Sequence, residues 1–471
     1  MSRDISVLVR RYPRPRPEIS LPVDFLPRFI EFEYILILRL LMRIFLFFSF
    51  VTLLLGLASC GSRPNASVSS PAVPVIDVEA AMADLQPALK LSDFGVDVRY
   101  IPLETRDSCL VSLGSVKVFD GNIVVSSRQN YVVLNFDKET GRFIAQLGHR
   151  GEDPEGYWGL TPYYNESNSL FYFERLPDQL QKYDAQGKYR GKVLIPTPPE
   201  RPCAYAFEDS LVIGYHDIQP HNARQLSCFT ERGELKDSVL CVPDLMPLQR
   251  DEKVFGMMRL SMAQINFTMD AAGVPWIDLQ SSFPLWKCGG QVRLKEGFGD
   301  TIFTLKDHHR LVPAYAFRYG DLALDAKSRR EGKSRGKLVA YAVLETQEKI
   351  FFKAVRGLYE SVVERQAATP GENGRVDLPD FELYNGIYNK QTGITRMAPE
   401  AGGIVDDLTG DLPFEIRSCS SPQGEFVFSL EAHEVVPWLE AHPEAKDNPR
   451  LAPLLKVKEE DNPVVVIVSD K

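Results

Sequence analysis

The segment LNFDKETGRF (residues 134–143) establishes the pattern of the chain, because two later segments repeat it. These segments read LQKYDAQGKY (residues 180–189) and LSCFTERGEL (residues 226–235), and the glycine in each lies 46 residues after the previous one. An apolar run precedes every polar turn, and a glycine accepts the positive φ that a tight turn requires. A fixed period in the forties is typical of a β-propeller, in which each repeat is one four-stranded antiparallel sheet.

Turn signals elsewhere extend this pattern over the rest of the chain. Asp120-Gly121 lies between two short apolar runs, which is a strong signal for a hairpin. The first hairpins of the repeats are expected to turn near residues 120–121, 167–168, 208–209, 270–273, 346–347 and 421–424, and the second hairpins near residues 139, 185, 232, 307–308 and 391–392.

These signals give six first hairpins and five second hairpins, so half a repeat is missing. The apolar segments Val98–Leu103 and Val464–Val468 supply it if they pair, which also removes an open sheet edge. We therefore predict an all-β fold, a six-bladed β-propeller at residues 96–471 that is closed by strands from both termini. Trp438–Lys458 is expected to form a short helical C-terminal segment interrupted by prolines.

Two segments are too long for the repeat. Pro243–Ala263 is rich in methionine, and Arg356–Pro379 contains glycines and several charged residues. Both are predicted to be insertions between strands, and long loops on a rigid scaffold often bind ligands or partners.

The stretch MRIFLFFSFVTLLLGLASCGS (residues 42–62) has the order of a bacterial lipoprotein signal. One cation, Arg43, precedes an apolar run that is long enough for export and short for a permanent membrane span. Cys60 ends a Leu-Ala-Ser-Cys sequence at the place of a lipobox, so we predict cleavage before Cys60 and attachment of acyl chains to it.

The regions around this signal complete the predicted domain organisation. Residues 42–59 are expected to be the signal peptide, and residues 1–41 to be an upstream misassignment of the start, although an extended cytoplasmic arm before a signal anchor is the alternative. Residues 60–95, which begin with a Ser- and Pro-rich segment, are predicted to be a tether and lead-in. The protein is therefore expected in the cell envelope, anchored to the membrane by lipid on Cys60 outside the cytoplasm, at the periplasmic or surface face of the outer membrane.

Composition excludes some classes of partner and chemistry. The formal net charge is −9, with 63 acidic and 54 basic side chains, which argues against a nucleic-acid partner. Six cysteines follow Cys60 without a Cys-x-x-Cys pair, so zinc or thioredoxin-like chemistry has no support and buried thiols are the preferred interpretation. No catalytic, phosphate-binding or dinucleotide-binding motif is present in a supporting context, so the sequence leaves the cofactor unknown.

An aromatic cluster is the best candidate for a ligand site. Tyr157, Trp158, Tyr163 and Tyr164 lie close together in the sequence. If the segment is a loop, their rings form a platform for the apolar face of a sugar or a peptide side chain; if it is a strand, alternate rings pack between sheets. The sequence leaves both interpretations open.

A second candidate is a cation site at Asp406 and Asp407. Together with Asp411 they would offer the clustered oxygen atoms that hard cations prefer. The spacing is not that of an EF-hand, and a Gly/Asp turn between two sheets is the preferred interpretation.

Several of these segments are shared with a known group of proteins. They are YIPLE (100–104), the FDKETG hairpin (136–141), GHRG leading to EGY (148–157), GDTIF (299–303), the Asp406-Asp407 turn and EDNPV (460–464). On these segments the chain resembles the six-bladed β-propeller lipoproteins of Bacteroidota, which are related in architecture to NHL-type propellers. The resemblance covers residues 75–471 and implies the fold without implying a chemistry, because most members have no assigned activity. The chain reads GEDPEGY at residues 151–157, where the family usually has Gly-x-Gly-Pro-Gly-Glu-Tyr, so any ligand of this loop is expected to differ too.

The sequence therefore favours a membrane-anchored, non-catalytic module that binds a glycan, a peptide or an envelope protein. Two alternatives stay open: a propeller hydrolase, lyase or lactonase with a site at the channel mouth, and a structural subunit of an envelope complex. Fold alone does not choose among these functions. Converging carboxylates or histidines in the channel would favour an enzyme, whereas an aromatic-rich rim would favour binding.

Overall fold

A computed structural model describes residues 73–111, 114–196, 201–216, 224–240, 253–269, 275–325, 328, 335–358, 381–410, 412, 414, 416 and 424–470. The predicted signal peptide, the upstream extension and Cys60 lie outside these residues, as does most of the expected insertion Arg356–Pro379.

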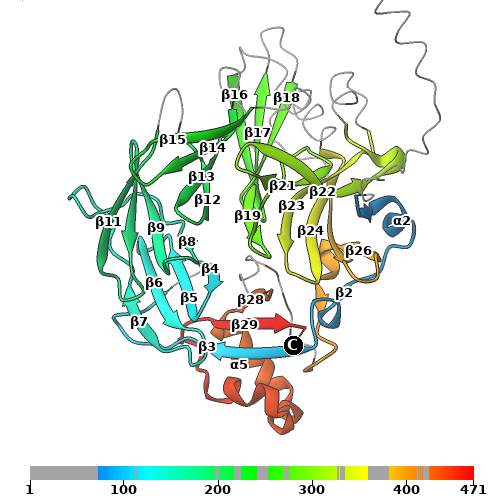
Figure 1. The fold of residues 1–471 in the computed structure, drawn as a ribbon. Helices are drawn as coiled ribbons and strands as arrows, with labels where there is room; N and C mark the ends of the chain where they lie inside the picture. Colours follow the sequence, from blue (N-terminus) through cyan, green and yellow to red (C-terminus); the bar gives the residue numbers. More distant parts are fainter. Residues whose placement is uncertain are drawn as a thin grey trace, which may run out of the picture. The chain divides into compact units, whose positions relative to one another are not determined.

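Antiparallel sheets dominate the described part of the chain (Figure 1). Four of them have four strands each. They consist of β4 (Gly114–Phe119), β5 (Asn122–Ser127), β6 (Val132–Asp137) and β7 (Phe143–Gln146); β8 (Tyr163–Asn165), β9 (Leu170–Arg175), β10 (Gln179–Tyr183) and β11 (Tyr189–Leu194); β12 (Ala204–Glu208), β13 (Leu211–Tyr215), β14 (Arg224–Thr230) and β15 (Leu235–Leu240); and β23 (Leu338–Glu345), β24 (Lys349–Arg356), β25 (Glu382–Asn389) and β26 (Thr395–Pro399).

Three further sheets depart from this plan. The sheet β19–β22 has a fifth strand, β1, which pairs in parallel with β22; the terminal sheet takes strands from both ends of the described chain; and the added sheet β16–β18 has three strands. Their strands are β19 (Leu285–Cys288), β20 (Gln291–Leu294), β21 (Thr301–Lys306), β22 (Arg310–Arg318) and β1 (Val75–Asp77); β28 (Phe426–Leu430), β29 (Val464–Ser469) and β3 (Asp97–Pro102); and β16 (Lys253–Leu260), β17 (Ala263–Met269) and β18 (Pro275–Ser281).

The remaining elements are short. A two-stranded parallel pair joins β2 (Leu89–Lys90) to β27 (Ile404–Val405). The helices are α2 (Val78–Ala83), η1 (Leu91–Asp93), η3 (Gly320–Leu322), η4 (Glu400–Gly402), α5 (Ala432–Ala441), η5 (Pro443–Asp447) and η6 (Pro449–Lys456). The predicted C-terminal helical segment is thus present, but it begins before Trp438, and the 3-10 helices η5 and η6 each begin at a proline.

The repeated glycines are located in turns, as their spacing predicts. Gly141, Gly187 and Gly233 have φ values of 67°, 74° and 79° in the hairpins that follow β6, β10 and β14. Each turn also rests on the outermost strand of a neighbouring sheet. A Cβ on Gly141 or Gly187 would come closer than 3.0 Å to the carbonyl oxygen of Pro102 or Gln146, respectively. Glycine is therefore required at these positions both by the backbone conformation of the turn and by the contact with the neighbouring sheet.

Buried apolar side chains lie between neighbouring sheets. Among the described residues they form six clusters. Each cluster contains residues of two sheets that pack face to face, and one of them also contains Met262, Ala263, Ile265 and Leu279 of the added sheet and its first turn. The pairs are β4–β7 with β8–β11; β8–β11 with β12–β15; β12–β15 with β19–β22; β19–β22 with β23–β26; β23–β26 with the terminal sheet; and the terminal sheet with β4–β7. Four-stranded sheets that pack in this way have the architecture of a β-propeller.

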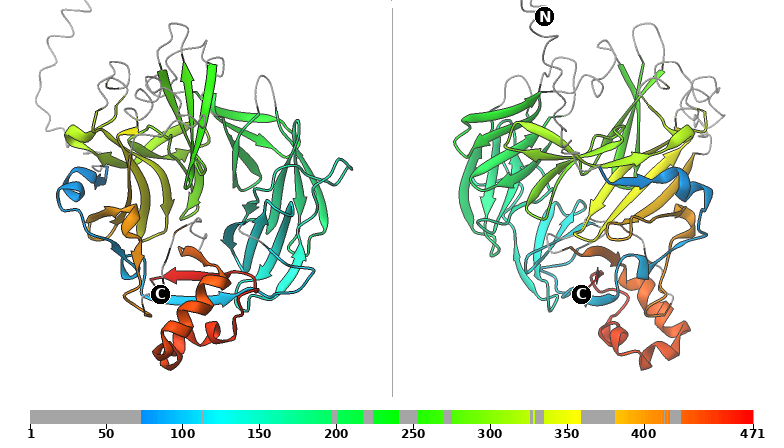
Figure 2. Two further views of the ribbon diagram at one scale, coloured as in Figure 1. Left: turned by 180° about the vertical axis from the view of Figure 1, so that it is seen from behind. Right: turned by 45° about the vertical axis from the view of Figure 1, so that its right-hand side comes forward.

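The expected pairing of the two end segments is present in the terminal sheet (Figure 2). β29 lies between β28 and β3, with Val464 opposite Pro102 and Val468 opposite Val98. Val464, Val466 and Val468 face one cluster, whereas Val465 and Ile467 face another, because successive side chains of a strand point to opposite faces. An unbroken apolar run is therefore what a strand buried on both faces requires.

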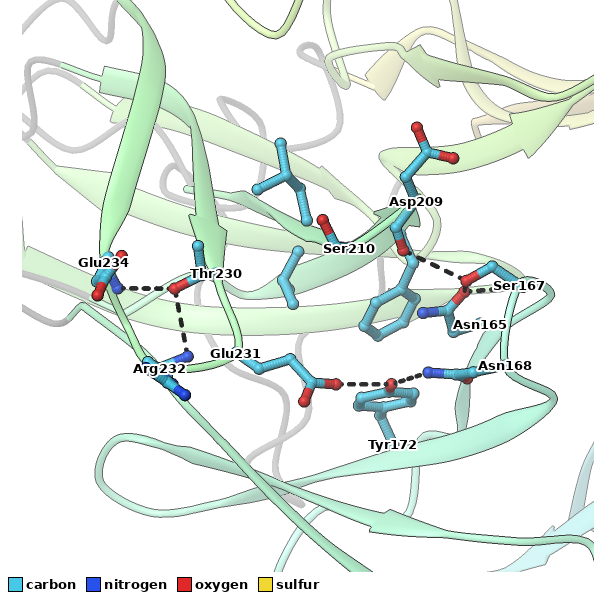
Figure 3. A pocket seen from close by; sticks show the side chains of 13 residues that line it. Asn165, Ser167, Asn168, Tyr172, Asp209, Ser210, Thr230, Glu231, Arg232 and Glu234 are labelled. Carbon is cyan, nitrogen blue, oxygen red and sulfur yellow. Dashed lines mark hydrogen bonds between the residues drawn. The ribbon is translucent and has the colours of Figure 1, made fainter.

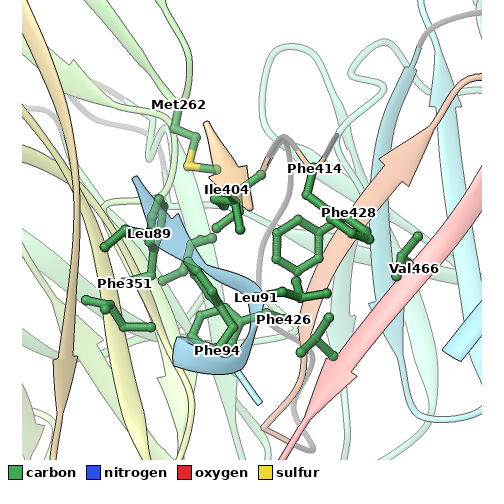
Figure 4. Close-up of a cluster of buried hydrophobic side chains, with 14 of the residues drawn as sticks. Leu89, Leu91, Phe94, Met262, Phe351, Ile404, Phe414, Phe426, Phe428 and Val466 are labelled. Atoms are coloured by element: carbon green, nitrogen blue, oxygen red, sulfur yellow. The ribbon is translucent and has the colours of Figure 1, made fainter. Parts of the chain in front are cut away.

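The lead-in that the structure describes, from residue 73 onward, is part of the folded unit, whereas residues 60–72 of the expected tether lie outside the described residues. β1 extends a sheet, and Phe94 packs in the cluster of Figure 4 with its ring centroid 5.7 Å from that of Phe351 and 5.2 Å from that of Phe426. From residue 75 onward, the lead-in contributes strand β1 and the buried side chains of Leu89, Leu91 and Phe94.

The expected fourth repeat is also corrected. Pro243–Ala263, predicted to be an insertion, includes strand β16, and the turn near 270–273 joins two strands of the added sheet. A hairpin turn at Gly289 and Gly290, where φ is 57° and 73°, was missed. The described strands consequently form seven sheets of three or more strands, and the predicted number of six blades is not confirmed by this count.

Candidate functional site

The first strands of five sheets converge on one cavity of about 260 Å³. They are β4, β8, β12, β19 and β23, and each is the first strand of its antiparallel four-stranded unit. In a propeller the first strand of each blade lines the central channel, so side chains from distant parts of the sequence meet there.

Aromatic side chains form much of the cavity wall. Tyr163 and Tyr205 meet edge to face, with ring centroids 5.1 Å apart. The centroid of the Tyr164 ring lies 5.0 Å from that of Phe119. Trp286 on β19 and Phe283 in the segment before β19 also line the cavity. These rings give the wall flat apolar surfaces of the kind that hold small organic ligands.

Two lysines bring positive charge to the same wall. Lys117 Nζ donates a hydrogen bond to the carbonyl oxygen of Pro162 at 3.1 Å and lies 5.5 Å from the centroid of the Phe283 ring. Lys287 Nζ lies 3.1 Å from a carboxylate oxygen of Glu166. Both lysines are partly exposed within the cavity, so a bound molecule with acceptor groups can reach them.

A buried carboxylate fixes one side of the cavity. Glu345 at the end of β23 has a side chain with no exposure, and it accepts hydrogen bonds from Trp286 Nε1 at 2.8 Å and Lys390 Nζ at 2.7 Å. Arg293 Nε lies 3.3 Å away. A buried charge with two cations and an indole N–H is satisfied by its own neighbours, so Glu345 orients Trp286 rather than serving as a free acid.

A second carboxyl group lies behind the aromatic wall. The Tyr163 hydroxyl donates to Glu174 Oε1 at 3.1 Å, and Arg201 lies 3.5 Å from the other oxygen. Burial raises the pKa of Glu174 above its usual value, and burial also raises the pKa of Tyr163 well above its usual value. Tyr163 is therefore a protonated hydrogen-bond donor at neutral pH, held in place by Glu174.

The four predicted aromatic residues do not form one platform. Tyr157 is completely buried, stacks on Phe173 at a centroid distance of 4.4 Å and donates its hydroxyl hydrogen to the carbonyl oxygen of Leu147. Trp158 is 40% exposed on the surface, whereas Tyr163 and Tyr164 line the cavity. Tyr157 is thus a core residue although it lies in a loop, whereas Trp158 faces solvent and the strand residues Tyr163 and Tyr164 line the cavity.

The two predicted cation ligands are engaged in hydrogen bonds within the protein. Asp406 is buried and accepts from the backbone N–H groups of Leu408 and Thr409 at 3.0 and 2.8 Å. Asp407 accepts from the backbone N–H and the hydroxyl of Ser92 at 3.0 and 2.7 Å. Both carboxylates therefore stabilise a turn and its contact with η1, and the described residues contain no group of three side chains placed to bind a metal ion.

The cysteines are free thiols where they are described. Cys109 and Cys228 are buried, as expected, and burial raises the pKa of both thiols. Cys203 is exposed at the cavity wall, which the preferred interpretation of buried thiols did not predict. Cys241 and Cys419 lie outside the described residues.

A larger and more open hollow of about 580 Å³ lies at the turns of sheets β8–β11 and β12–β15 (Figure 3). Its polar side chains mostly serve their own turns. Thr230 Oγ1 accepts from the backbone N–H groups of Arg232 and Glu234, and Asn165 Oδ1 accepts from that of Ser167. We therefore regard the aromatic cavity as the stronger candidate site.

Sequence reasoning missed most of the cavity residues, and those that carry the proposed contacts are Lys117, Tyr205, Phe283, Trp286 and Lys287. Their common feature is a position in or just before β4, β12 or β19. That position was readable for Lys117 and Tyr205, but the side chains become neighbours only through contacts between sheets.

Family membership follows from a match over most of the chain. The family model of DUF4934, described as a domain of unknown function, matches residues 73–469. The chain belongs to this family. No curated protein matches it. In the described ranges, no helix is both long and apolar enough to cross a membrane.

Solved structures add information on the fold. A protein of Bacteroides fragilis that is presumed to be exported has a TM-score of 0.53 and 16% sequence identity, over 84% of this chain and 99% of that chain. The WD40 repeats of RRP9 have a TM-score of 0.35 and 10% identity, over 82% of this chain and 99% of theirs. Because the Bacteroides fragilis protein shares only 16% sequence identity with this chain, the similarity shows the fold alone.

Proposed function

We propose that this DUF4934 protein is a non-catalytic binding module, a lipid-anchored β-propeller outside the cytoplasm that captures a small ligand in its aromatic cavity. The convergence of aromatic rings and two lysines from five sheets on that cavity carries the proposal. A rigid scaffold that holds such groups in place avoids the entropic cost of ordering them for each ligand.

The architecture proposed for this module is a closed ring of six blades, with the added sheet β16–β18 outside the ring. Six apolar clusters support it, because they connect the six sheets one after another and one of them joins the terminal sheet to β4–β7. Side chains of the added sheet pack against the cluster between β23–β26 and the terminal sheet. A closed ring leaves no open edge around the cavity, which suits a fixed binding site.

The proposed ligand is small and has both a flat apolar face and hydrogen-bond acceptors. The cavity volume of about 260 Å³ is just below the range of about 300–1,000 Å³ for drug-sized ligands, which favours a sugar unit or a short peptide. Rings such as Tyr205 and Phe283 would cover the apolar face, while Lys117 and Lys287 would meet the acceptors.

Trp286 provides the test of ligand binding. We expect a member of a panel of mono- and disaccharides and tripeptides to change the tryptophan emission of the purified protein, and Trp286→Phe to remove that change. Phe283→Ala should weaken binding about tenfold or more through loss of apolar contact. Phe143→Ala is the matched control, because this half-buried ring lies on β7, away from the cavity.

Three results would contradict the proposal: no response to any ligand of the panel, equal effects of the two phenylalanine variants, or turnover of a lactone, ester or peptide that is lost in Glu166→Gln.

The membrane anchor has its own test. Intact-mass analysis of the native protein should show the loss of residues 1–59 and the addition of acyl chains, and Cys60→Ala should abolish both.

A further inference from the structure

An exposed arginine lies against two exposed aromatic rings on the surface. The Arg150 guanidinium carbon is 4.5 Å from the centroid of the Tyr131 ring and 5.3 Å from that of the Trp158 ring. Tyr131 is 53% and Trp158 40% exposed. We call these three residues the arginine clamp. Within the described parts of the chain, no carboxylate lies within ion-pair distance of Arg150, so its N–H groups are available to an external acceptor.

The loop that carries Arg150 and Trp158 is held rigidly from inside. Five consecutive carbonyl oxygens of this loop accept hydrogen bonds from three side chains of β9 and β10. Arg175 binds the carbonyl oxygens of residues 152, 153 and 156, Gln181 Nε2 that of residue 154 at 3.0 Å, and the Tyr183 hydroxyl that of residue 155. Arg175 therefore occupies the place that a bound cation would take in a carbonyl-lined loop, and the loop conformation does not depend on a ligand.

Backbone hydrogen bonds place the two clamp residues of this loop side by side. The Tyr157 N–H donates to the His149 carbonyl oxygen and the Gly151 N–H to that of Tyr157, both at 3.1 Å, so Arg150 lies opposite Tyr157. The next residue, Trp158, donates its N–H to the Glu174 carbonyl oxygen at 2.8 Å. The backbone at both clamp residues is thus held in place before any ligand binds, which lowers the entropic cost of ordering this loop on binding.

Tyr131 completes the clamp from a different turn of the chain. It lies in the turn between β5 and β6 with φ of 55°, a left-handed conformation that is uncommon for residues other than glycine, asparagine or aspartate. Ser169 and Asp209 have similar φ values, of 56° and 50°, in other hairpin turns of the chain. The conformation has a use here, because it leaves the ring beside the Arg150 guanidinium.

The clamp has the chemistry of a receptor for an acidic sugar. A planar guanidinium binds a carboxylate through two parallel hydrogen bonds, and the aromatic rings beside it offer flat apolar surfaces. A uronic acid has both complements, since its carboxylate is attached to a ring whose C–H groups form an apolar face. The side chain of an acidic peptide has the carboxylate but no rigid apolar face to cover Tyr131 and Trp158. We propose that the arginine clamp binds uronic-acid units of an acidic polysaccharide, independently of the ligand of the cavity.

Oligogalacturonate is the probe that tests this proposal. Isothermal titration calorimetry at low ionic strength should show binding to the native protein, and methyl esterification of the carboxylates should weaken it about tenfold or more. Arg150→Gln should cause a loss of the same size, and Arg150→Lys an intermediate loss, because lysine keeps the charge but not the planar fork. Arg142→Gln is the matched control, since Arg142 is an exposed arginine in the turn at the opposite end of the same sheet.

The aromatic part of the clamp is tested separately. Trp158→Phe should retain most of the affinity and Trp158→Ala should lose it, and circular dichroism should show an unchanged fold, because the side chain is on the surface. The proposal is overturned if the native protein does not bind oligogalacturonate, or if Arg150→Gln and Arg142→Gln bind it equally. It is also overturned if poly-L-glutamate binds as tightly as oligogalacturonate in an Arg150-dependent way, since the clamp would then recognise acidic peptides.

Discussion

Replacing Gly141 with alanine should destabilise the protein more than the same replacement of Gly393, although the two glycines occupy equivalent turns. The turns read DKETGR and NKQTGI, and in each the glycine N–H donates to the carbonyl oxygen of the residue four positions earlier, Asp137 or Asn389, at 2.9 Å. Their φ values are 67° and 70°. The two substitutions therefore share their local backbone effects.

The two glycines differ in what surrounds them. A Cβ on Gly141 would come closer than 3.0 Å to the carbonyl oxygen of Pro102 in the terminal sheet, whereas a Cβ on Gly393 would meet nothing within 4 Å. A left-handed alanine costs about 1–2 kcal/mol, partly offset by about 0.4–1 kcal/mol from the lower entropy of the unfolded chain. Displacing the backbone of Pro102 adds about 1–3 kcal/mol. We expect a loss of about 1 kcal/mol for Gly393→Ala and about 3 kcal/mol for Gly141→Ala.

Equilibrium unfolding in urea, followed by circular dichroism, measures both losses. Comparison at a common m-value ensures that the difference in midpoint reports stability. The difference between the two variants isolates the contact between sheets, because the backbone and unfolded-state effects cancel. Equal losses, or a larger loss for Gly393→Ala, would refute the reasoning that the repeated glycine is required by the neighbouring sheet.

Two further predictions concern the terminal sheet and a buried lysine. Deleting Val464–Ser469 removes the middle strand of the terminal sheet, so the cooperative thermal transition should be lost; a variant that melts like the native protein would show that β29 is dispensable. Lys295 is buried, donates to the Ala340 carbonyl oxygen at 2.7 Å, and has a pKa lowered by burial to about 7. Since the unfolded chain binds more protons between about pH 7 and 10.5, the unfolding free energy should rise with pH in that window. The rise between pH 7.5 and 9.5 should be smaller in Lys295→Met, and equal slopes would contradict this assignment.

Local signals predicted the hairpins well. The turn glycines at residues 141, 187 and 233 are determined by a few neighbouring residues, and the apolar runs of β3 and β29 identify strands that are buried on both faces. The Gly289-Gly290 turn carried an equally strong signal, but β19 and β20 on either side have only four residues each. Missing that turn merged the added sheet with β19–β22.

The candidate site was less predictable because it depends on which sheets meet. Tyr157 and Trp158 are adjacent in the sequence, yet Phe173 covers the first and solvent reaches the second. Nothing within the loop distinguishes them, since burial is decided by a strand that lies elsewhere. The cavity has the same origin: Lys117 and Phe283 approach each other only when β4 and the segment before β19 line one cavity.

The composition of the terminal sheet has a consequence for how the chain acquires its fold. Strand β3 is made early, but its described partner β29 follows after most of the chain, and the hydrogen bond from Asn462 to the Glu104 carbonyl oxygen spans 358 residues. Sheets β4–β7, β8–β11 and β12–β15 can dock one after another as they emerge, because the turns at Gly187 and Gly233 each rest on the sheet made before. During this interval the backbone of β3 can pair with other chains, so aggregation and proteolysis compete with folding. This interval lasts at least as long as the synthesis of the residues between β3 and β29.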